Sequence, residues 1–225
     1  MHYKVLSTID YNYKMKNNKV QLDTLNEIKN LMQRSSRFVS LSGIAGMAAG
    51  IVAVSGAVII SIYLQIGFIE KVPGVMLSAE NPFKANLIFI FTILFSVFIL
   101  ALILTFYFSS RNAKRKNIIF WDSMAKKVFA NLLFFLITGG MFCLILLYYG
   151  IYFLIVSSML IFYGLALINL SKFTFNEIAQ LGIIEICLGV IAAFIPVYPV
   201  LFWMIGFGVL HLIYGIYVYL KYERD

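Results

Sequence analysis

The sequence is poor in charged residues, and this scarcity excludes most soluble folds. Only 12% of the 225 residues are Asp, Glu, Lys or Arg, whereas 62% are hydrophobic. A soluble domain usually carries roughly twice that charged fraction. A water-soluble globule of this length has too little interior to bury so much apolar surface. We therefore expect most of the chain to be surrounded by lipid.

Cysteine, histidine and proline are also scarce, and each shortage excludes some chemistry. The two cysteines, Cys143 and Cys187, lie in apolar runs without the spacing of a metal site or a disulfide framework. The sequence contains no phosphate-binding loop, zinc-protease motif or serine-hydrolase motif. We therefore expect no enzymatic activity, no catalytic residues, no metal and no cofactor. None of the four prolines falls in the interior of a predicted span, which disfavours a transporter built on unwound helices.

Long uncharged runs are present instead, and they predict an all-α, polytopic membrane protein. Residues 38–69 and 128–171 contain no charge over 32 and 44 positions, whereas a span needs roughly 20. The second run is therefore two spans, with a tight turn at Tyr148-Tyr149-Gly150. The prediction is six transmembrane helices arranged as three hairpins, at residues 39–67, 86–110, 128–148, 151–170, 178–195 and 199–220.

The basic residues predict the orientation of these spans. Sixteen of the 18 Lys and Arg residues fall in the N-terminal arm, two loops and the C-terminal tail, which lie on one side of the predicted membrane. Only Lys71 and Lys84 fall on the other side. Basic loops stay in the cytoplasm, so both termini are predicted there, in an inner (plasma) membrane. The net charge of +8 then reflects topology and contact with anionic lipid, and we expect no nucleic-acid binding.

The N-terminal arm, residues 1–37, is predicted to be cytoplasmic and to precede the transmembrane domain at 38–220 and a tail at 221–225. Apolar residues recur at helical spacing over 20–36, which predicts an amphipathic helix. This helix would lie on lipid headgroups, on the protein's own loops, or on a protein partner or second copy. The candidate interfacial contacts to lipid or another anion are Arg34, Ser35, Ser36 and Arg37, whose alternative role is to anchor and cap the first span.

Two further features concern the interior of the membrane domain. Gly46, Gly50, Ala53 and Ala57 share one face of the first span, where small residues let a neighbouring helix approach closely. We expect packing within the chain there, with dimerisation as the alternative.

Glu185 and His211 are the two ionisable residues deep in the predicted spans. Each lies thirteen positions from Tyr198, at the turn between the last two spans, so an antiparallel hairpin places them at the same depth. At ~1.5 Å per residue this depth is roughly 15–20 Å, near the midplane. The functional hypothesis is a proton or ion relay or a ligand anchor, and the alternative is a hydrogen-bonded pair that fixes helix register. Ser157, Ser158, Tyr163, Asn169 and Tyr214 are candidates to extend the pair.

Two resemblances accompany these patterns. The segment Asn26–Gly43, NEIKNLMQRSSRFVSLSG, running into a glycine- and alanine-rich helix, resembles the start of uncharacterised six-helix inner-membrane proteins of Bacteroidota. The last hairpin, with glycines at 182, 189, 206, 208 and 215, is similar to the HdeD-like short-repeat membrane family. The first resemblance implies an inner-membrane location, and the second a link to acid stress. Neither implies catalytic residues.

The sequence therefore supports two hypotheses about function. The first is a non-enzymatic integral membrane protein with a structural, stress-related or partner-binding role. The second is a small channel or transporter that uses the pair of Glu185 and His211.

Overall fold

A computed structural model describes residues 24–25, 42–68, 86–117, 120–121 and 123–224. The chain divides into two compact units, Met1–Arg37 and Phe38–Asp225. In the first unit, Thr24 and Leu25 are helical. The rest of the predicted amphipathic helix, and the candidate contacts Arg34, Ser35, Ser36 and Arg37, lie outside the described residues.

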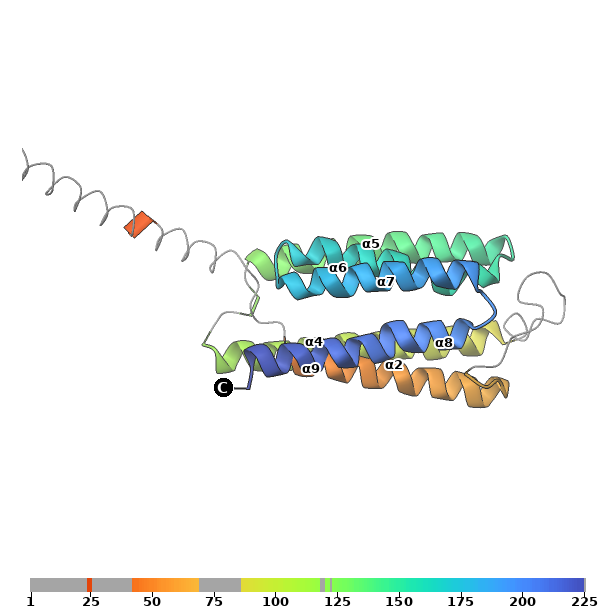
Figure 1. The fold of residues 1–225 in the computed structure, drawn as a ribbon, viewed down its shortest axis with the longest axis horizontal. Helices are drawn as coiled ribbons and strands as arrows, with labels where there is room; N and C mark the ends of the chain where they lie inside the picture. Colours follow the sequence, from red (N-terminus) through yellow and green to blue (C-terminus); the bar gives the residue numbers. More distant parts are fainter. Residues whose placement is uncertain (1–23, 26–41, 69–85, 118–119, 122, 225) are drawn as a thin grey trace, which may run out of the picture. The chain divides into compact units, whose positions relative to one another are not determined.

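The described part of the second unit is helical and contains six helical segments long and apolar enough to cross a membrane (Figure 1). This confirms the prediction of an all-α fold with six helices long and apolar enough to be membrane spans. The segments are α2 (Gly43–Leu64), α4 (Leu87–Arg115), α5 (Ser123–Tyr148), η1 and α6 together (Tyr152–Leu154 and Ile155–Ser171), α7 (Asn176–Phe194), and α8, η2 and α9 together (Pro199–Trp203, Met204–Leu210 and His211–Tyr222).

Two helix boundaries differ most from those predicted, by five residues each. α4 continues five residues past 110, and α5 begins five residues before 128. The basic residues between these spans are therefore partly helical. The prediction ended each span where the charges begin, but a helix does not have to stop where the lipid does. Lys114 and Arg115 in fact lie in the last turn of α4, where they complement the helix dipole.

The turns follow local backbone chemistry. Gly150, between α5 and α6, has φ of +74°, a left-handed conformation that glycine adopts without steric cost. This confirms the turn predicted at Tyr148-Tyr149-Gly150. Pro199 is the first residue of α8, a position where its missing N–H is not needed. α2 begins at Gly43, whose backbone N–H donates to Glu223 Oε1 at 2.6 Å, so the last turn of the chain caps the first span.

The six segments pack in two groups (Figure 1). In the α2 group, α2 lies between α4 and the last span, which comprises α8, η2 and α9. In the α6 group, α6 lies between α5 and α7. The groups touch where α6 and α7 contact the last span, mainly at α8 and η2, and we call this contact the seam. The closest packing of α7 is with α6, and that of α9 is with α2, so the last two spans do not pair mainly with each other.

Small residues mark the closest contacts inside each group. A methyl group at Gly182 of α7 would lie 2.6 Å from the carbonyl oxygen of Gly164 on α6, and the reverse substitution gives the same distance. The predicted small-residue face of α2 lies in a similar contact within the same chain. A methyl group at Gly46 would lie 3.2 Å from Gly215 Cα, and one at Gly50 would lie 2.8 Å from Gly208 O. Ala53 and Ala57 are buried beside them.

Candidate functional site

The structure brings Glu185 and His211 together at the seam. His211 Nδ1 lies 3.6 Å from Glu185 Oε1. Glu185 is on α7 of the α6 group, and His211 is the first residue of α9 in the α2 group. Glu185 is nine residues before the end of α7, which places it roughly 14 Å along the helix axis from that end. The short distance between the two side chains agrees with the equal depth inferred by counting thirteen residues from Tyr198.

His211 is oriented by two hydrogen bonds that the pair alone did not predict. Its Nδ1 lies 3.1 Å from the carbonyl oxygen of Gly206, and its Nε2 lies 2.7 Å from the hydroxyl of Tyr163. A carbonyl oxygen only accepts, so Nδ1 carries a proton. In the neutral imidazole, Nε2 then accepts from the Tyr163 hydroxyl. Tyr163 is on α6, so this hydrogen bond also crosses the seam.

The Gly206 carbonyl belongs to a π-helical segment. η2, Met204–Leu210, interrupts the α-helical last span directly before His211. Such wide turns are rare, and they often occur at functional sites. The four prolines predicted no break here, and the segment instead contains Gly206 and Gly208.

Glu185 is completely enclosed. Its side chain is 0% exposed, and neither carboxylate oxygen has a hydrogen-bond partner among the described residues. The packing around it is tight, because a methyl group at Gly206 would lie 2.8 Å from Glu185 Oε2 and would also clash with Leu160. An ionised carboxylate in such a place is costly without a counter-charge, and His211 is the nearest candidate to supply one.

The cluster can hold its protons in two arrangements. A neutral carboxylic acid can lie beside a neutral imidazole, or a carboxylate can lie beside an imidazolium. The two arrangements differ in the position of one proton, which is on Glu185 in the first and on His211 Nε2 in the second. In both, Tyr163 keeps a hydrogen bond to Nε2, because its hydroxyl both donates and accepts.

The other four residues proposed to extend the pair have different surroundings. Ser157 Oγ donates to the carbonyl of Gly189 at 2.7 Å and so ties α6 to α7. Ser158 is buried, and the hydroxyl of Tyr214 is buried without a hydrogen-bond partner among the described residues. Asn169 contributes its carbonyl to the end of α6, where it accepts from the N–H of Lys172. Of the five candidates, Tyr163 is the one hydrogen-bonded to His211.

The sequence did not identify Gly206 as a partner of His211, and it offered Tyr163 only as one of five candidates to extend the pair. A backbone carbonyl has no residue signature, and the choice of Tyr163 depends on which face of α6 meets α9. The glycine pair at 206 and 208, one turn before a deep histidine, was the available signal.

No group of His, Cys, Asp and Glu side chains among the described residues is arranged to hold a metal ion. Cys143 and Cys187 are both free thiols. Comparisons of this chain with protein-family models, with curated proteins and with solved structures find no match. The described residues form six helices of membrane-spanning length and apolarity, with a buried Glu–His–Tyr cluster between two helix groups.

Proposed function

We propose that this chain is a non-enzymatic membrane protein in which Glu185, His211 and Tyr163 hold two helix groups in one register. The observation that carries this proposal is the complete enclosure of Glu185, with no room for even a methyl group at Gly206. A transport path needs space or water beside its ionisable groups, whereas residues that hold two helix groups in one register need close contact. The contacts of His211 with Glu185 and Tyr163 across the seam provide this close contact.

The wider role in this proposal is structural, stress-related or partner-binding work at the inner membrane. Both termini lie in the cytoplasm, and an amphipathic cytoplasmic helix precedes the six spans, whose predicted arrangement as three hairpins does not hold for the last two. The sidedness of sixteen among 18 basic residues supports this orientation, as does the even number of spans. The partners are anionic lipids at the basic face, and a second copy or another protein at residues 20–36.

A second candidate function is proton-linked transport, and one observation favours it. Both oxygens of Glu185 lack a hydrogen-bond partner among the described residues. Burying a polar group without hydrogen bonds costs free energy, which is unfavourable for a residue whose role is only to fix the register of two helix groups. Buried ionisable groups in membranes are often proton relays. The position of the cluster between two helix groups would let one group move against the other as the proton shifts.

A paired measurement of flux and stability distinguishes the two candidates. The purified protein is placed in vesicles that contain a pH-sensitive dye, and a proton gradient is applied. The holding role predicts the same proton entry as empty vesicles. It also predicts that Glu185→Gln lowers the thermal unfolding midpoint, because the replacement removes the electrostatic contact with His211 while keeping the volume.

Glu177→Gln is the matched control, because Glu177 is on the same helix and pairs with Lys221 near the chain's C-terminal end. Its effect on the unfolding midpoint should be smaller. Proton entry above that of empty vesicles, abolished by Glu185→Gln and kept by Glu177→Gln, would establish transport and end the holding proposal. A Glu185→Gln protein at least as stable as the wild type would also contradict the holding role.

A further inference from the structure

Charged and aromatic side chains at the ends of α7 and α9 form a second contact across the seam. Lys221 Nζ, in the last turn of α9, lies 2.5 Å from Glu177 Oε1, in the first turn of α7. The hydroxyl of Tyr222 donates to the same oxygen at 2.9 Å, and its ring stacks on Phe175 with centroids 4.5 Å apart. Because α9 belongs to the α2 group and α7 to the α6 group, these four residues join the two groups, and we call them the clasp.

The clasp and the Glu185 cluster lie on the same face of α7. Glu177, Leu181 and Glu185 follow one another at steps of four residues, which places all three on one side of the helix. Glu185 is therefore roughly 12 Å along the helix axis from the clasp. Leu181, between them, is 6% exposed and belongs to a buried apolar cluster against which Tyr214 of α9 packs. Water entering along this face must pass the clasp and then this apolar layer before it reaches Glu185.

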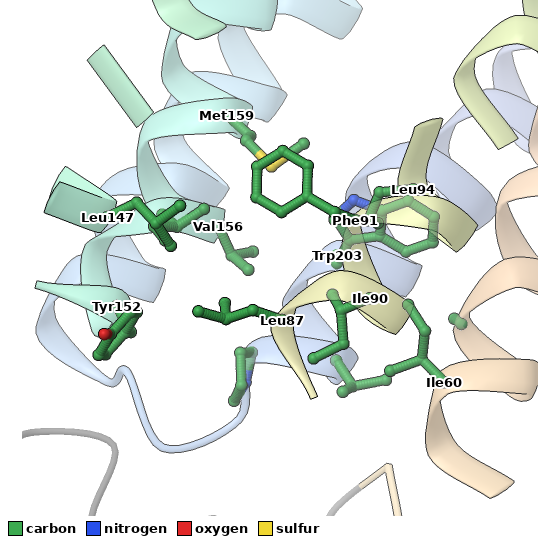
Figure 2. Close-up of a pocket in the computed structure, with 14 residues that line it drawn as sticks. Ile60, Leu87, Ile90, Phe91, Leu94, Leu147, Tyr152, Val156, Met159 and Trp203 are labelled. Carbon is green, nitrogen blue, oxygen red and sulfur yellow. The ribbon is translucent and has the colours of Figure 1, made fainter. Parts of the chain in front are cut away.

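The opposite end of the seam, where α8 begins, is apolar. A pocket of about 100 Å³ lies there between the two groups, and Figure 2 shows Leu147 and Val156 on one side of it and Ile90 on the other. Of the fourteen described side chains that line this pocket, none is charged, and only Tyr152 and Trp203 carry a polar atom. Apolar cavities stay dry, so water is not expected to enter the seam from this end.

Opening at the clasp end would hydrate polar atoms that the closed seam leaves without partners. The hydroxyl of Tyr214 and both carboxylate oxygens of Glu185 are buried, with no hydrogen-bond partner among the described residues. Each of these atoms costs free energy while it is dry. The clasp itself is a weak contact, because Lys221 is 44% exposed and exposed ion pairs contribute little. The two groups should therefore separate most easily at the clasp.

We propose that the clasp is a gate that keeps the seam closed at this end, and that its opening admits water to Tyr214 and then to Glu185. Water raises the local dielectric and so weakens the contact between Glu185 and His211. The gate thus regulates the cluster from one end of the membrane domain. This regulation rests on the proposed holding role, because the cluster fixes the register of the two groups only while water is kept out.

The rate of thiol labelling in the apolar layer tests the gate. Cys143 and Cys187 are replaced by Ala, and Leu181→Cys adds one thiol between the clasp and Glu185. The full-length protein is placed in lipid nanodiscs, where both membrane faces are open to a charged methanethiosulfonate reagent that does not enter lipid. Mass spectrometry follows the labelling. We expect slow labelling with the clasp intact, and labelling at least about fivefold faster when Lys221→Gln and Tyr222→Ala are added, because less free energy is then needed to open the seam.

Two controls separate the gate from a general loosening of the protein. Glu223→Gln removes a charge next to the clasp, but Glu223 contacts Ser42 and Gly43 within the α2 group, so the rate at Leu181→Cys should not change. Ala192→Cys lies nearer the α8 end of α7 and is 3% exposed. It should stay slow in every clasp variant, because that end of the seam remains closed.

Reversing the ion pair tests the attraction itself. Glu177→Lys or Lys221→Glu alone places like charges together and should speed the labelling, whereas the two together restore an attraction and should slow it again. Circular dichroism establishes that each variant is folded, and Tyr214→Cys probes the same layer from α9 if Leu181→Cys does not fold.

Two results would reject the gate. One is an unchanged rate at Leu181→Cys when the clasp is removed, and the other is an equal acceleration at Leu181→Cys and Ala192→Cys. Neither result bears on the holding role, which is judged separately by proton entry and by the unfolding midpoint of Glu185→Gln.

Discussion

Helices α2 and α4 lie side by side, but they differ in how much of each helix is buried in the protein. α4 contains the most apolar stretch of the six spans, yet only 6% of that stretch is buried in the protein. The corresponding stretch of α2 is less apolar, and 39% of it is buried. α5 behaves like α4, at 11%, whereas the remaining three spans lie between 33% and 39%.

The difference shows that apolarity does not place a helix in the centre of this protein. Lipid tails are as apolar as leucine, so burying a leucine against another helix gains little transfer free energy. The central helices instead carry small residues at their contacts. α2 has glycines at 43, 46, 50 and 56, and α4 has none. Close backbone approach, together with a few interhelical hydrogen bonds, is therefore what we expect to hold the centre together.

The substitution expected to have the largest effect adds a single methyl group between α6 and α7. Gly182→Ala places Cβ 2.6 Å from the carbonyl oxygen of Gly164, so the two backbones must separate. Overpacking of this kind costs about 1–3 kcal/mol. We expect the free energy of unfolding, measured by denaturant titration in mixed micelles, to fall by that amount.

The control is Gly140→Ala on α5, where a methyl group would meet nothing within 4 Å. Glycine inside a helix is less favourable than alanine by about 0.5–1 kcal/mol, so this variant should be slightly more stable than the wild type. Equal effects of the two substitutions would contradict the distinction between central and peripheral helices.

A smaller test removes one hydrogen bond between central helices. Ser157→Ala deletes the bond from Ser157 Oγ on α6 to the carbonyl of Gly189 on α7. Such bonds in membrane proteins contribute about 0.6 kcal/mol on average. Thr138→Val on α5 is the comparison, because Thr138 Oγ1 donates to Phe134 within its own helix. The same unfolding titration should show a loss for Ser157→Ala alone, and a comparable loss for Thr138→Val would count against this explanation.

The sequence was enough to predict the spans and part of the site. Charge-free runs longer than one span, and the glycine at 150, located the helices because lipid excludes charge from its interior. Counting from Tyr198 placed Glu185 and His211 at one depth, because a helix advances by a fixed rise per residue.

The neighbours of each helix could not be predicted in the same way. Chain order suggested that α7 pairs with the last span, but α7 packs most closely on α6. This pairing follows from the close contact between the backbones at Gly164 and Gly182. Such a contact depends on how the surfaces of two helices fit together, which the residue pattern of one segment does not show. Tyr163 and the π-helical carbonyl of Gly206 could not be assigned to the site from the sequence for the same reason.

The smallest expected effect is on the lipid-facing side of α4. Phe95 is 64% exposed in the protein, so Phe95→Ala exchanges one contact with lipid tails for another and should leave the free energy of unfolding nearly unchanged. Ile60→Ala on α2 removes a smaller side chain that is 5% exposed and packs in the apolar cluster between α2, α4 and α8. It should cost more than Phe95→Ala, because the cavity it leaves loses packing contacts that lipid does not restore. The reverse order, with Phe95→Ala as the more damaging change, would mean that this face of α4 is covered by protein, as in a homo-oligomer, and that α4 is peripheral only in the single chain.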